Sequence, residues 1–181
     1  EIICHTLRHL KNMANNIFLI GFSGSGKSSV GKKLAKYLNY NFLDTDRIIE
    51  KTTSLSIDET ISTKGEKEFR NIETQVLSKI DFSQNNVIST GGGLPTEKDN
   101  IRIMKSNGSI IWLKASIDSI YDRLKNSKEI RPLIGNHIEK ENIESLYNSR
   151  QSVYNIADVS IDTDNKNLDE ITKELINKNE R

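Results

Sequence analysis

The sequence predicts an α/β protein built in three layers, with a parallel sheet of five strands and helices on both of its faces. Five short apolar runs alternate along the chain with longer stretches in which apolar residues recur at helical spacing. The first apolar run leads directly into the glycine-rich segment "GFSGSGKSS", which is typical of a strand, phosphate-binding loop and helix. Sheets of this kind bind ligands at the carboxyl ends of their strands, so we expect the chemistry there.

The five strands are predicted at 17–20 ("IFLI"), 40–43 ("YNFL"), 86–89 ("NVIS"), 109–113 ("SIIWL") and 157–162 ("ADVSID"). One-sided apolar stripes predict the helices between and after them, since each stripe can bury only one face. These stripes run from Val30 to Leu38, from Phe69 to Ile80, from Ile143 to Tyr154 and from Leu168 to Leu175.

The chain has 181 residues, a length that suits one domain with a single core. Met13 opens the first strand region, and we expect residues 1–12 to be a vector-derived or otherwise non-native extension. The single domain then spans 13–181. The polar segment 126–137, "NSKEIRPLIGNH", has the composition of a mobile lid.

The charge balance makes a nucleic-acid partner unexpected, because 26 basic and 25 acidic residues are spread along the chain without a basic run. No apolar run approaches the length of a membrane span, so no membrane association is expected. Cys4 is the only cysteine, which excludes an intrachain disulfide and favours a cytoplasmic location. A monomer is the expectation for a domain of this size.

The strongest signal is the pattern G-x-x-x-x-G-K-[ST] between a strand and a helix. Lys27 is expected to reach the β and γ phosphates of ATP, and the Ser28 hydroxyl to bind Mg²⁺. An ordinary glycine-rich turn is the alternative, but loop, lysine, serine and flanking elements all agree. The predicted phosphate-binding residues are Gly24, Ser25, Gly26, Lys27, Ser28 and Ser29.

Two aspartates follow the second predicted strand in "FLDTD". On an extended chain Asp44 and Asp46 would point to the same side, and a cation would relieve their repulsion. The strand "NVIST" ends without an acid, so we predict that Asp44 supports Mg²⁺ and that Asp46 accepts a hydrogen bond from the attacking hydroxyl. Alternatively, Asp46 only caps the helix "RIIE".

Further candidates lie along the rest of the chain. Arg70 and Glu73 share a helix face, where a surface ion pair is the simpler interpretation. The residues Gly91, Gly92 and Gly93 end the third strand and would let a ligand approach the backbone. Arg131 in the lid could stabilise the transferring phosphoryl group, and Arg150 could point into a cleft and pair with a carboxylate.

Taken together, "GFSGSGKSS", "FLDTD", "GEKEFRNIE", "STGGG", "RPL" and "LYNSRQSVY" resemble the shikimate kinase family in order and spacing. The resemblance implies a nucleoside-monophosphate-kinase-like fold and the ATP-dependent phosphorylation of the 3-hydroxyl of shikimate, in aromatic amino-acid biosynthesis. It implies that Asp44 serves the Mg²⁺ site and that Asp46 binds shikimate hydroxyls and acts in catalysis.

The same resemblance implies that Arg70 and Arg150 bind the shikimate carboxylate. It makes Gly91, Gly92 and Gly93 a contact of the substrate, and Arg131 a phosphate contact. Arg123 is the available arginine for stacking on adenine.

Two alternative functions were compared with this one, and the sequence favours shikimate kinase over both. A related kinase, such as one for gluconate, would share the phosphate loop but would not need paired arginines for a carboxylate. A GTPase-type switch or nucleotide-dependent binding module needs D-x-x-G and N-K-x-D motifs, and the chain contains neither.

Overall fold

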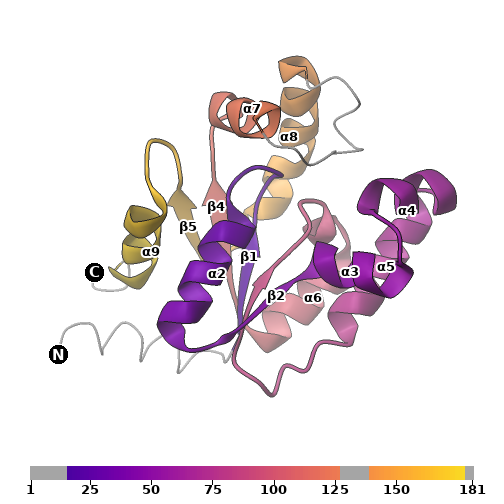
Figure 1. Cartoon of the computed structure of the whole chain (residues 1–181), viewed down its shortest axis with the longest axis horizontal. Coiled ribbons are helices and arrows are strands. Elements are labelled where there is room, and N and C mark those ends of the chain that lie inside the picture. The colour runs from indigo at the N-terminus through magenta and orange to yellow at the C-terminus, as the bar shows by residue number, and fades with distance from the viewer. Residues whose placement is uncertain (1–15, 127–138, 178–181) are drawn as a thin grey trace.

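The computed structural model describes residues 16–126 and 139–177 (Figure 1). The extension predicted at 1–12 lies outside the described residues. So does the predicted lid, including Arg131, except for Asn126 at the end of a helix.

The described residues form one parallel sheet, and all five predicted strands are confirmed to within two residues at their ends. The strands are β1 (Asn16–Ile20), β2 (Asn41–Asp44), β3 (Asn86–Ser89), β4 (Ser109–Lys114) and β5 (Val159–Asp162). Their order across the sheet is β2-β3-β1-β4-β5, and every neighbouring pair is parallel. The glycine-rich loop after β1 therefore emerges at the middle of the edge where all five strands end.

The predicted stripes correspond to helices α2, α5, α8 and α9, and shorter helices fill the remaining connections. The helices are α2 (Lys27–Leu38), α3 (Thr45–Thr53), α4 (Ile57–Lys64), α5 (Glu66–Ser78), α6 (Lys98–Asn107), α7 (Ile117–Lys125), α8 (Lys140–Tyr154) and α9 (Leu168–Asn177). A single 3₁₀ turn, η1 (Leu94–Thr96), follows β3.

Side chains of β1 alternate between two cores, one on each face of the sheet. Ile17 and Leu19 pack with residues of α2 and α9, whereas Phe18 and Ile20 pack with residues of α5, α6 and α8. All of β1 is buried, as expected for the central strand of a sheet covered on both sides. The packing confirms the predicted three-layer architecture.

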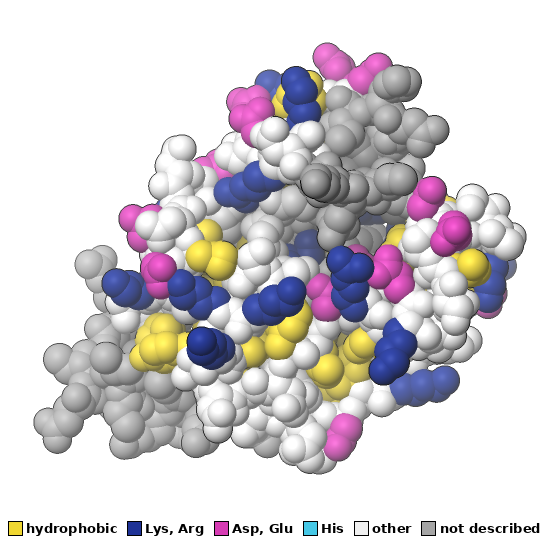
Figure 2. Space-filling view, viewed as in Figure 1, with side chains coloured by type: hydrophobic (Ala, Val, Ile, Leu, Met, Phe, Trp, Pro, Cys, Tyr) yellow, Lys and Arg dark blue, Asp and Glu magenta, His cyan; other side chains and the backbone are white. Residues whose placement is uncertain are grey.

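Helix α2 lies on the front of the molecule beside α9 (Figure 1), and Lys33 of α2 forms an ion pair with Asp169 of α9. Figure 2 shows Lys and Arg side chains mixed with Asp and Glu side chains on this face. Among the helices of the described ranges, none combines the length and the apolar character needed to cross a bilayer.

Candidate active site

The phosphate loop connects the end of β1 to α2. Gly26 is the N-cap of α2 with φ of 94°, a left-handed conformation that favours glycine. The ammonium group of Lys27 donates hydrogen bonds to the carbonyl oxygens of Gly21 and Phe22, both at 2.8 Å, and is thus held over the loop. Ser25 Oγ is buried and has no hydrogen-bond partner within the described part of the chain. The loop therefore presents a cation, a hydroxyl and a helix N-terminus, which together suit an anionic ligand.

Ser28 and Asp44 lie together next to this loop, although sixteen positions separate them. Ser28 Oγ donates a hydrogen bond of 2.6 Å to Asp44 Oδ2 and lies 3.3 Å from Ser89 Oγ. The parallel pairing of β2 with β3 puts Asp44 opposite Ser89 and brings both to the phosphate loop. These hard oxygen atoms suit Mg²⁺, which is bound by few protein ligands when phosphate and water complete its shell. Within the described ranges no cluster of three or more acidic, His or Cys side chains forms a metal cage.

The predicted geometry of the two aspartates was wrong in one respect. Helix α3 begins at Thr45, so Asp44 and Asp46 do not lie on one extended strand. Asp44 is the N-cap residue, because its Oδ1 accepts hydrogen bonds from the N–H groups of Asp46 (3.2 Å) and Arg47 (3.4 Å). The alternative in which Asp46 is the cap is therefore also wrong. Asp46 lies in the first turn of α3, where the helix dipole favours a negative charge.

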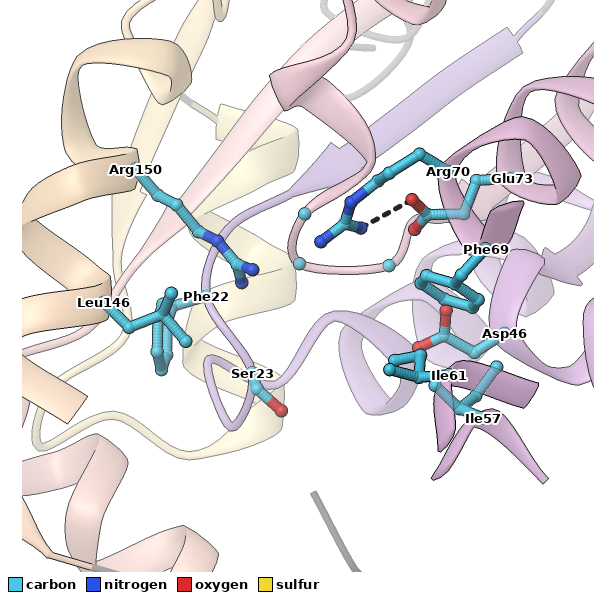
Figure 3. Close-up of a pocket in the computed structure, with 13 residues that line it drawn as sticks. Phe22, Ser23, Asp46, Ile57, Ile61, Phe69, Arg70, Glu73, Leu146 and Arg150 are labelled. Carbon is cyan, nitrogen blue, oxygen red and sulfur yellow. Dashed lines mark hydrogen bonds and ion pairs between the residues drawn. The ribbon is translucent and has the colours of Figure 1, made fainter. Parts of the chain in front are cut away.

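Asp46 lines a pocket next to the phosphate loop (Figure 3). Arg70 and Arg150 point toward each other across this pocket from α5 and α8, and Asp46 lies below Arg70 in the view. The lining residues are Phe22, Ser23, Asp46, Ile57, Ile61, Phe69, Arg70, Glu73, Gly91, Gly92, Gly93, Leu146 and Arg150.

Arg70 and Glu73 form a buried pair, which contradicts the simpler interpretation of a surface ion pair. Arg70 Nη1 lies 2.6 Å from Glu73 Oε2, and the Glu73 side chain is 1% exposed. Arg70 Nη2 also lies 3.0 Å from Glu66 Oε1. Burial raises the pKa of Glu73 to about 7, with a further contribution from the Asp46 carboxylate, although Arg70 opposes the rise. Glu73 thus holds the Arg70 guanidinium in place at the pocket.

Each glycine of the triplet faces a different functional group. A β-carbon on Gly91 would lie 2.7 Å from Asp46 Oδ1 and 2.8 Å from Glu73 Oε1. A β-carbon on Gly93 would lie 2.6 Å from Arg70 Nη1, and one on Gly92 would lie 3.3 Å from the backbone nitrogen of Ser23 in the phosphate loop. The absence of side chains therefore lets the triplet lie against the acids, the arginine and the phosphate loop together.

Arg150 is 7% exposed, and no acidic side chain within the described residues forms an ion pair with it. Burial lowers the pKa of its guanidinium, which packs over the Phe22 ring at 5.9 Å from its centroid. A buried cation beside a pocket favours the binding of an anion, because the anion provides the negative charge that no described acidic side chain places in an ion pair with Arg150.

Arg123 joins α7 to two loops at the same edge of the sheet. Its guanidinium donates to the carbonyl oxygen of Gly24 at 3.3 Å, and to Thr163 Oγ1 at 3.1 Å and Thr163 O at 3.0 Å. Arg123 therefore links the phosphate loop to the loop between β5 and α9.

The structure brings Lys27, Ser28 and Asp44 together on one side of the phosphate loop, and Asp46, Arg70, the glycine triplet and Arg150 around the adjoining pocket. Ser29, in the first turn of α2, is exposed. Glu73 was predicted only as a surface partner of Arg70, and Tyr154 only as part of an apolar stripe, so neither was predicted to act at the site. The i, i+3 spacing to Arg70 and the i, i+4 spacing to Arg150 were the available signals, but neither spacing reports burial.

A phosphate loop next to a pocket with two arginines and an aspartate defines a small-molecule kinase of the P-loop class. The family model described as shikimate kinase matches residues 23–180. The chain belongs to the shikimate kinase family, and its reaction is that of the family, the transfer of a phosphoryl group from ATP to shikimate.

Relatives and solved structures agree with this assignment. A shikimate kinase from Sulfurihydrogenibium sp. is 42% identical over 92% of this chain and 98% of that protein, and one from Persephonella marina is 40% identical over 89% and 96%. The structure of a shikimate kinase from Acinetobacter baumannii in complex with shikimate has a TM-score of 0.85 at 30% identity, covering 96% of this chain and 98% of that one. The Aquifex aeolicus shikimate kinase has a TM-score of 0.75 at 37% identity, with coverage of 89% and 94%.

Proposed function

We propose that the pocket holds shikimate with its carboxylate on Arg70 and Arg150 and its 3-hydroxyl beside Asp46, facing the γ-phosphate of ATP. The observation that carries this proposal is the convergence of a buried guanidinium, that of Arg150, and a largely buried one, that of Arg70, on a glycine triplet that also contacts the phosphate loop. A carboxylate at one end of the acceptor fits the arginines, and its hydroxyl then lies between Asp46 and the transferring phosphate.

The arginines have different roles in this proposal. Arg70 already shares its charge with Glu73 and Glu66, so it contributes a fixed set of N–H donors. Arg150 has no acidic partner among the described side chains and contributes most of the uncompensated positive charge. The substrate carboxylate thus compensates for the hydration that the Arg150 guanidinium loses on burial.

Asp46 is the group that accepts a hydrogen bond from the substrate hydroxyl. Its carboxylate lies close to that of Glu73, since both approach Gly91. With Glu73 protonated or paired with Arg70, Asp46 remains the acceptor nearest the hydroxyl. It aligns the nucleophile and can take its proton as the bond to phosphorus forms.

The residues around the phosphate loop fit Mg²⁺-ATP. Ser28 and Asp44 would hold the metal, directly or through water, and the metal would neutralise charge on the β and γ phosphates. Lys27 would exchange a loop carbonyl for a phosphate oxygen, and Ser25 Oγ and the backbone from Gly24 to Ser29 would complete the cradle. Arg131 as a further phosphate contact, a monomeric state and a cytoplasmic location remain predictions.

The test is ADP release with a panel of acceptors: shikimate, gluconate and nucleoside monophosphates. We expect turnover with shikimate and with neither other acceptor, because gluconate is an open chain without a ring and nucleoside monophosphates have no carboxylate for the two arginines. Turnover of gluconate without turnover of shikimate would contradict the proposal.

A variant tests the role of Asp46 in the same assay. Asp46→Asn should lower kcat by about 10² to 10⁴ while the dissociation constant for ATP changes by less than about twofold. Asp99→Asn is the control, because Asp99 on α6 is exposed and does not line the pocket. This variant should behave as the wild type. An equal loss of ATP affinity and kcat in Asp46→Asn would indicate a structural role instead.

A further inference from the structure

Tyr154, the last residue of α8, connects this helix to the glycine triplet. Its side chain is 1% exposed, and its hydroxyl donates a hydrogen bond of 2.7 Å to the carbonyl oxygen of Gly92, 62 positions away. The ring packs against Trp112 of β4, with 5.5 Å between centroids. Tyr154 therefore links α8 to β4 through its ring and to the glycine triplet through its hydroxyl.

Arg150 precedes Tyr154 by four residues and so lies on the same face of α8. Both side chains meet at Gly92, because the Tyr154 hydroxyl donates to its carbonyl oxygen and a β-carbon there would lie 3.7 Å from Arg150 Nη1. Burial raises the pKa of Tyr154 far above its ordinary value, even though the Arg150 charge opposes the rise. The phenol therefore stays neutral and keeps the proton that it donates to the carbonyl oxygen of Gly92.

We propose that Tyr154 is a positioning residue for the acceptor, which sets the Arg150 guanidinium against the backbone of Gly92. This inference rests on the proposed roles of Arg150 and the triplet in binding the substrate. Tyr154 does not line the pocket, so it acts through those two partners. It also couples the acceptor side to the phosphate loop, because Gly92 lies next to the backbone of Ser23.

Packing alone would not require a hydroxyl at this position. A phenylalanine would fill the same space against Trp112 and would avoid burying a polar group. The hydroxyl adds a hydrogen bond to Gly92 and a polar oxygen on the face of α8 that carries Arg150, and both Gly92 and Arg150 border the pocket. A cation on a long, flexible side chain has many rotamers, and fixed polar groups beside it restrict those rotamers before the substrate arrives.

The first experiment compares Tyr154→Phe with Tyr40→Phe. Tyr40 packs against the opposite core and has no side-chain hydrogen bond among those found in the described residues, so its variant is the matched control. We expect Tyr154→Phe to raise the KM and the calorimetric Kd for shikimate about tenfold, with the KM for ATP changed less than about twofold. Equal rises in both KM values, or no change in either, would overturn the proposal, since a purely structural role predicts one of these results.

A double-mutant cycle with Arg150→Met separates this inference from the proposed function. If Tyr154 acts through Arg150, adding Tyr154→Phe to Arg150→Met should raise the KM for shikimate by less than about threefold. Fully multiplicative effects would overturn the positioning role. If Arg150→Met alone leaves the KM unchanged, the proposed function is wrong.

The cycle is measured well below the lowest unfolding temperature of the four proteins, since Tyr154→Phe leaves the Gly92 carbonyl without its donor. If the single variant Tyr154→Phe does not fold, binding of shikimate to Tyr154→Met is compared with binding to Tyr40→Met. Equal Kd values for these two proteins would likewise overturn the proposal.

Discussion

Arg150→Met is expected to separate stability from substrate binding. The unliganded protein buries the Arg150 guanidinium to 7% exposure without an acidic partner among the described residues, and burial lowers its pKa. Methionine keeps much of the side-chain volume beside the Phe22 ring and removes the desolvated charge. Replacing a buried, unpaired charge by an apolar group of similar size is often neutral or stabilising. We therefore expect an unfolding temperature equal to or above that of the wild type.

The cost of this substitution falls on the substrate carboxylate. A charge-assisted hydrogen bond contributes about 1.5–3 kcal/mol, and removing one partner of a desolvated ion pair costs about 2–5 kcal/mol. Arg70 remains, but Glu73 and Glu66 already share its charge. We take about 3 kcal/mol, which corresponds to a rise of about 10² in the KM for shikimate. The assay is initial-rate kinetics with each substrate varied, together with thermal unfolding of the unliganded protein.

Arg102→Met is the matched control, because Arg102 on α6 is 78% exposed and its pairing with Asp99 lies at the surface. It should leave both KM values unchanged. A strongly lowered unfolding temperature of Arg150→Met, with a KM for shikimate within about threefold of the wild-type value, would instead show that Arg150 serves stability and not binding of the carboxylate.

Two further predictions concern the phosphate loop and the buried acid. Lys27→Ala should lower kcat by about 10² to 10³ or more, because charge stabilisation is most of what the protein contributes to phosphoryl transfer. Lys36→Ala, on the exposed face of α2, is the control. Near-wild-type turnover of Lys27→Ala would contradict the assignment of the phosphate loop. The pKa of Glu73 rises from an ordinary 4.5 to about 7 on folding, so the folded state binds more protons between these values and wild-type stability falls as pH increases through them. Glu73→Gln lacks this loss, and its free energy of unfolding relative to wild type should improve by up to about 3 kcal/mol from pH 4.5 to pH 7.5 in denaturant titrations. A difference that does not vary with pH would show that folding leaves the pKa of Glu73 at its ordinary value.

Local sequence patterns determined the sheet and the phosphate loop. The apolar runs of the strands and the one-sided stripes of α2, α5, α8 and α9 report burial directly, because periodicity reflects the faces that a strand or helix presents to a core. The loop pattern is equally local, since a strand, a turn and a helix N-terminus within a dozen residues form the anion site. Parallel topology then brings Asp44 and the glycine triplet to the same edge, which the sequence also predicted.

The predicted roles of the two aspartates show where local reasoning ends. Period-two spacing placed Asp44 and Asp46 on one side, but the strand stops at Asp44 and the helix begins at the next residue. The Asp44 carboxylate receives two N–H donors of α3 and the hydroxyl of Ser28, so it can serve as cap and as metal support. The spacing alone does not reveal where a strand gives way to a helix.

Local patterns in the chain were thus enough to predict the α/β fold, the phosphate loop and six of the thirteen residues that line the acceptor pocket. The packing of whole elements was needed to show that Glu73 is buried, that Arg150 has no acidic ion-pair partner among the described residues and that Tyr154 reaches Gly92. Burial and hydrogen bonding between α8 and a loop 62 positions earlier depend on how whole elements pack. A pairwise spacing within one helix carries no information about that packing.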